Sequence, residues 1–100
     1  MNSTPAADAA LLLAWLQAHP RPATYARAAR VLNTNARSPR LNAALDVLPA
    51  EWSALVVAAP RRPREPSLPR EGWFVLHAPE ARTELDRYMA WHRAVKRHFA

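Results

Sequence analysis

The chain has 100 residues, 50% of them apolar, and a formal net charge of +6 at pH 7. This length and composition predict a single domain, residues 1–100, with a modest hydrophobic core. The absence of cysteine excludes disulfides, thiolate metal ligands and a cysteine nucleophile.

Two helices are predicted in the first third of the chain. Thr4, followed by proline, is typical of a helix N-terminus, and the breaker sequence HPRP predicts that this helix ends at Ala18. Residues 1–3 are expected to be a flexible start. Thr24 is expected to cap a second helix, which ends at Asn33. The residues of the second helix that we expect to face inward are Ala26, Ala29 and Leu32.

A third helix has the clearest apolar pattern. Ser38, followed by proline, again predicts a helix start. Apolar residues then follow at the i, i+3, i+4, i+7 spacing that predicts one buried side. They are Leu41, Ala44, Leu45 and Leu48. The residues expected to point outward are Arg40, Asn42, Ala43, Asp46 and Val47.

In the second half of the chain, the sequence predicts strands as well as a helix. Residues 52–59, WSALVVAA, form a short apolar run that predicts a strand, and residues 72–78, GWFVLHA, predict another. Residues 60–71 connect them and are called the Pro/Arg loop here. A last helix is predicted over residues 80–99. Its inner side is expected to consist of Leu85, Tyr88, Trp91, Val95 and Phe99.

This order of elements predicts an α+β, mainly helical fold. Three helices followed by two strands are typical of a winged helix-turn-helix, here with a two-stranded β wing, a long Pro/Arg loop and a C-terminal helix. In such a domain the third helix enters the major groove of DNA, and the wing contacts a flanking groove or the backbone.

The distribution of charge favours a polyanionic partner. No acid lies between Asp8 and Asp46, and of the 14 cations only Lys96 is not an arginine. Arginine binds phosphate in a bidentate manner, so we expect double-stranded DNA as the partner. The arginines of this window are Arg21, Arg27, Arg30, Arg37 and Arg40.

The third helix and the Pro/Arg loop are the expected contacts. Arg40 and Asn42 match the side chains that bind guanine and adenine edges, and Ser38 begins a helix that can hold a phosphate. Phosphate contact alone, or a solvated helix face, are the alternatives. The four prolines of the loop favour a stiff arm whose arginines follow a phosphate chain. A solvated linker or a protein partner are the alternatives there.

No catalytic, metal or cofactor motif is present. His92 and His98 are six residues apart and cannot bind one metal as an i, i+4 pair would. There is no glycine-rich phosphate loop and no serine with an evident base, so we expect no enzyme activity and no cofactor. The longest apolar run is too short for a membrane helix, and residues 1–8 lack the basic stretch of a secretory signal. We therefore expect a cytoplasmic protein with no membrane partner.

The stretches TYARAARVL, ARSPRLNAALDVLP and TELDRYMAW resemble the DNA-binding domain of methylguanine-DNA methyltransferases and alkyltransferase-like proteins. The resemblance covers roughly residues 22–91. It implies that Tyr25 rotates a phosphate, that Arg40 or Arg37 fills the gap left by a flipped base, and that Trp52 stands near the lost cysteine. Since the chain has no cysteine, alkyl transfer is excluded, and recognition of a base or lesion is what the resemblance implies.

The sequence therefore predicts a small non-enzymatic DNA-binding protein. The alternative is a winged-helix adaptor or inhibitor that binds an acidic protein, in which the helix over residues 80–99 is expected to form a homodimer or a partner surface. The residues expected at the DNA are Tyr25, Arg27, Arg30, Arg37, Ser38, Arg40, Asn42, Arg61, Arg62, Arg64 and Arg70.

Overall fold

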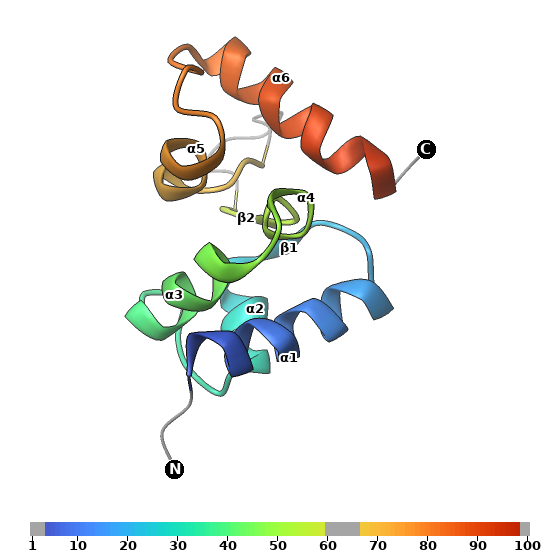
Figure 1. Ribbon diagram of the computed structural model, residues 1–100, viewed down its shortest axis with the longest axis vertical. Helices are drawn as coiled ribbons and strands as arrows, with labels where there is room; N and C mark the ends of the chain where they lie inside the picture. Colours follow the sequence, from blue (N-terminus) through green and yellow to red (C-terminus); the bar gives the residue numbers. More distant parts are fainter. Residues whose placement is uncertain (1–3, 60–66, 99–100) are drawn as a thin grey trace.

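The computed structural model describes residues 4–59 and 67–98 (Figure 1). Helices α1, α2 and α3 gather at one end of the molecule, and α5 and α6 lie at the other. The short helix α4 and a two-stranded sheet lie between these two groups. The prediction of a mainly helical fold with a small β component is thereby confirmed for the described part of the chain.

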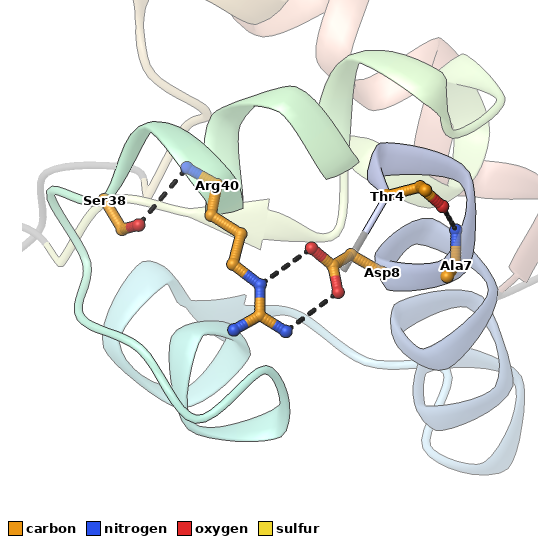
Figure 2. Close-up of polar contacts among 5 residues, drawn as sticks. All are labelled: Thr4, Ala7, Asp8, Ser38 and Arg40. Atoms are coloured by element: carbon orange, nitrogen blue, oxygen red, sulfur yellow. Dashed lines mark hydrogen bonds and ion pairs between the residues drawn. The ribbon is translucent and has the colours of Figure 1, made fainter. Parts of the chain in front are cut away.

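The three predicted helix starts are confirmed. Helix α1 spans Pro5–Ala18, α2 spans Tyr25–Val31 and α3 spans Pro39–Val47. Each is preceded by a hydroxyl residue whose oxygen accepts a backbone N–H of the first turn, as Figure 2 shows for Thr4 and Ser38. The distances are 3.1 Å to the Ala7 nitrogen and 3.2 Å to the Arg40 nitrogen. Local cap chemistry therefore determines where these helices begin.

Helix α2 differs from the prediction in its end and in its buried side. It stops at Val31 rather than at Asn33, which has a positive φ of 56° and so takes the left-handed conformation that terminates helices. Ala26 is exposed, whereas Ala28 is buried. The reason is that Tyr25 is buried, which sets the phase of the inner side at i, i+3, i+4 and i+7. That side consists of Tyr25, Ala28, Ala29 and Leu32.

The strand expected over residues 52–59 is shorter and pairs differently. The first residues of this segment belong to helix α4, Ala50–Ser53, and only β2, Val56–Val57, is a strand. Its neighbour in the sheet is β1, Ala23–Thr24, which runs parallel with Ala23 opposite Val56 and Thr24 opposite Val57. The sheet thus joins the start of α2 to the segment after α3.

The prediction of a second strand over residues 72–78 is wrong. This segment forms helix α5, Glu71–His77. Trp73 and Phe74 are buried, whereas the next two residues are exposed, a pattern that fits a helix and not an alternating strand. A short apolar run is compatible with either element, so periodicity could not decide between them. The predicted two-stranded β wing is therefore not formed by these two segments.

The last helix begins later than predicted and uses a different inner side. Helix α6 spans Glu84–Val95, starting after the cap residue Thr83, and the 3₁₀ turn η1 follows over Lys96–His98. Ala90 and Val95 are buried, but Leu85 is 69% exposed and Tyr88 is 38% exposed. The expected position of Phe99 lies outside the described residues. Trp91 holds α6 to the core, since its Nε1 donates to the Ala54 carbonyl at 2.8 Å.

Candidate nucleic-acid interface

Arg40, the expected base-reading residue, forms an ion pair within the protein. Its Nε and Nη2 donate to the two carboxylate oxygens of Asp8 at 2.8 and 2.9 Å (Figure 2). The side chain of Asp8 is 2% exposed and that of Arg40 is 37% exposed. The bidentate pair joins α1 to α3 and directs the guanidinium of Arg40 toward α1.

This ion pair changes the electrostatics of the predicted basic region. The hydrogen bonds from Arg40 hold the pKa of Asp8 below its ordinary value of 3.8, although burial of the carboxyl acts in the opposite direction. The carboxylate is therefore ionised at neutral pH, and it neutralises Arg40. The positive charge of the region between Asp8 and Asp46 consequently depends on its other arginines.

Replacing Asp8 by asparagine should make stability less dependent on pH under acidic conditions. Because the folded-state pKa is lowered, the contribution of Asp8 is complete above its unfolded pKa and is lost as pH falls through the folded value. Asp8→Asn should therefore lower Tm at pH 7 by more than about 5 °C and lose less stability than the wild type between pH 5 and pH 2. Thermal unfolding across this range measures both effects. Asp86→Asn is the control on the surface of α6, and equal pH profiles for wild type and Asp8→Asn would contradict the assignment.

Tyr25 and Arg70 form a second contact between distant segments. Tyr25 is 6% exposed, and its hydroxyl accepts the backbone N–H of Arg70 at 2.7 Å. The guanidinium carbon of Arg70 lies 4.1 Å from the centroid of the Tyr25 ring, and Nη1 donates to the Ala36 carbonyl at 2.9 Å. Burial raises the pKa of the Tyr25 hydroxyl. The end of the Pro/Arg loop is thus held against α2 and the α2–α3 connector, and the tyrosine expected at a phosphate is already bonded.

The other residues that were predicted to contact DNA differ in their exposure to solvent. Arg27, Arg30, Arg37 and Asn42 are exposed, on α2, on the α2–α3 connector and on α3. Ser38 is half-buried and caps α3. The other arginines of the Pro/Arg loop lie outside the described residues. They are Arg61, Arg62 and Arg64.

A cleft of about 360 Å³ lies between α3 and α5. Asn42 and Asp46 line it from α3, Trp73 and His77 line it from α5, and Arg70 lies at the start of α5. The sequence did not reveal this cleft, because α5 was expected to be a strand. Trp73 and His77 are four residues apart, a spacing that places both on one side of a helix and could have indicated the cleft.

The walls of the cleft combine aromatic rings with polar atoms. Trp73 Nε1 donates to Ser53 Oγ at 3.1 Å, which fixes the indole at the cleft wall, and His77 lies 5.4 Å from it between ring centroids. Burial lowers the pKa of His77, although the charges of Asp46 and Glu51 oppose this shift, so the imidazole is neutral at pH 7. A planar ligand with hydrogen-bonding edges fits such a site.

A smaller hollow of about 120 Å³ lies beside the start of α2. Trp15, His19, Arg21 and Arg27 line it, so two arginines contribute to this hollow. In the described ranges, 4–59 and 67–98, no group of three or more histidine, aspartate or glutamate side chains is placed to hold a metal ion. None of the helices in these ranges has both the length and the apolar character needed to span a bilayer.

No protein-family model matches this chain, and no curated protein or solved structure matches it. The resemblance to the DNA-binding domain of methylguanine-DNA methyltransferases therefore remains a prediction from the sequence.

Replacing Tyr25 by phenylalanine should destabilise the protein without creating a cavity in the core. The ring remains, but the part-buried N–H of Arg70 loses its acceptor, which costs about 1 kcal/mol. Tm should fall by about 4–8 °C. Thermal unfolding followed by circular dichroism measures the change. Tyr88→Phe is the matched control, because Tyr88 lies on the surface of α6, and an equal effect of both substitutions would contradict the role of the hydroxyl.

Proposed function

We propose that this protein binds double-stranded DNA through the exposed arginines of α2 and the α2–α3 connector. The observation that carries the proposal is the exposure of Arg27, Arg30 and Arg37, for which no ion pair with an acid is formed among the described residues. Arginines in this state are available to phosphates, and the release of counterions from DNA supplies the affinity. The net charge of +6 favours the encounter.

Helix α3 is the element that we place in the major groove. It begins at Ser38 beside the arginine-bearing connector, and Asn42 on its exposed side can pair with an adenine edge. In this proposal α2 crosses the DNA backbone and α3 enters the groove, as the two helices of a helix-turn-helix do. Arg40 orients α3 through Asp8 in this scheme and does not read a base.

The cleft between α3 and α5 is the site that we assign to an unstacked base. Its volume of about 360 Å³ accommodates a nucleobase, and Asn42 lies both on the exposed side of α3 and at the cleft. Enzymes and lesion-binding proteins hold a flipped base by stacking on aromatic rings and by hydrogen bonds to its edge. Trp73 and Asp46 offer these two kinds of contact. The sequence resemblance to alkyltransferase-like proteins supports the same assignment.

Removing exposed arginines should weaken DNA binding and reduce its dependence on salt. If four to six phosphates are neutralised, the slope of log K against log salt is roughly −4 to −5, and Arg27→Ala with Arg30→Ala should reduce its magnitude by about 2. Fluorescence anisotropy of a dilute labelled random duplex, titrated with protein at several salt concentrations between about 50 and 300 mM, measures the slope.

The charge-matched control for this experiment is Arg82→Ala with Arg93→Ala, two exposed arginines near and on α6. An equal reduction in both double variants would show attraction by net charge alone. Wild-type protein that does not bind duplex at low salt would contradict DNA binding and favour the alternative, an adaptor for an acidic protein.

Filling the cleft should abolish base unstacking and leave duplex binding intact. Gly72 lines the cleft, and a Cβ built there meets no atom within 4 Å, so a side chain can begin at this position without a clash at its Cβ. Gly72→Leu should suppress the fluorescence increase of 2-aminopurine opposite a mismatch or an alkylated guanine, while the salt-dependent affinity stays within about twofold.

Gly72→Ala is the conservative control, because a methyl group leaves most of the cleft open. Both substitutions should also raise the stability of α5 slightly, since glycine disfavours a helix by about 1 kcal/mol relative to alanine. A full fluorescence increase with Gly72→Leu would contradict the assignment of the cleft to a base.

A further inference from the structure

Helix α6 presents an apolar stripe to solvent along most of its length. Leu85, Tyr88 and Met89 are 69%, 38% and 47% exposed, and His92 is exposed as well. Their i, i+3, i+4, i+7 spacing places all four on one side of the helix. The other side packs onto the protein through Ala90 and Val95, so this stripe is not the face that joins α6 to the core.

The stripe is ordered by ring contacts. Tyr88 stacks on His92 with ring centroids 6.1 Å apart and an interplanar angle of 29°. Tyr88 also lies 6.0 Å from Trp91, whose indole is anchored to the Ala54 carbonyl. The exposed rings therefore have a defined arrangement, and docking against them costs little side-chain entropy.

Charges at the two ends of α6 have opposite signs. Glu84 and Asp86 lie in its first turn, whereas Arg93 lies in its last turn and Lys96 follows directly. All four are exposed, and none of them forms an ion pair within the part of the chain that the structure describes. A helix with this order of charge is complementary to a copy of itself that runs in the opposite direction.

We propose that two copies of this chain associate through an antiparallel pair of α6 helices. A twofold axis between Tyr88 and Met89 places each of these residues opposite the other in the second copy. Leu85 then faces His92, and Asp86 comes near Arg93 on the same flank of the helix pair, so apolar contacts lie at the centre and ion pairs at the rim. The charge order selects a second copy over an unrelated acidic or basic partner, since a partner of one sign meets repulsion at one end of α6.

The same charges keep α6 out of the proposed DNA interface. Glu84 and Asp86 would repel phosphates, and α6 lies at the opposite end of the molecule from α2 (Figure 1). Self-association is therefore independent of DNA binding. A helix of 12 residues is about 18 Å long, which limits the interface to less than the roughly 800 Å² per partner of a stable dimer. We expect a Kd of about 10–100 µM.

Sedimentation equilibrium at 5–500 µM tests the proposal. The apparent mass should rise from 11.2 kDa toward twice that value with increasing concentration. Reversal of the acidic end, Glu84→Lys with Asp86→Lys, and reversal of the basic end, Arg93→Glu with Lys96→Glu, should each weaken self-association at least tenfold. An equimolar mixture of the two variants should recover a dimer, and so should a single chain that carries all four substitutions.

The control reverses Glu80 and Arg82, exposed residues that precede α6, and should leave the Kd within about twofold. Circular dichroism checks that every variant is folded, and Leu85→Ser tests the apolar centre without a change of charge. A wild type that stays monomeric at 500 µM would overturn the proposal. A dimer that survives both reversals and Leu85→Ser, or a mixture that stays monomeric, would overturn it equally.

Discussion

A single buried carboxylate determines how the helices at one end of the molecule are arranged. The Asp8 side chain is 2% exposed on α1, and an ionised group in such a place is stable only if it is paired and hydrogen-bonded. Arg40 on α3 satisfies both carboxylate oxygens at once, which fixes the distance and the rotation of α3 relative to α1. Because that rotation is fixed, Asn42 and Asp46 line the cleft on the side of α3 that faces α5.

The features that could be predicted from the sequence are those that depend on neighbouring residues. Helices begin after Thr4, Thr24 and Ser38 because each hydroxyl oxygen accepts a hydrogen bond from a backbone N–H of the next turn. The donor and the acceptor are only two or three residues apart, so the sequence alone contains both. Helix α5 could not be predicted in the same way. Its short apolar run suits a strand or a helix, and the choice is made by burial of Trp73 and Phe74 against the rest of the core.

The candidate site depends still more on contacts between distant segments. Asp8 and Arg40 are 32 residues apart, so a sequence window that appears free of acids includes an arginine neutralised from outside the window. Tyr25 and Arg70 are 45 residues apart, and their contact builds one wall of the cleft. The sequence identified Arg40 and Arg70 as candidates for a basic surface, but it could not show that Asp8 and Tyr25 contact them in the fold.

The number of arginines therefore overstates the positive charge that this protein can offer to a ligand. Arg87 illustrates the point, because it donates to both carboxylate oxygens of Glu71 at 2.5 and 2.8 Å and lies 4.9 Å from the Phe74 ring. Like Arg40 and Arg70, it uses the planar guanidinium as a structural group, a use for which lysine is poorly suited. Its hydrogen bonds also lower the pKa of Glu71 and neutralise the charge of that carboxylate at the edge of the cleft. Asp46 then remains as the cleft acid without a paired arginine among the described residues, and a ligand edge that donates hydrogen bonds is the one it favours.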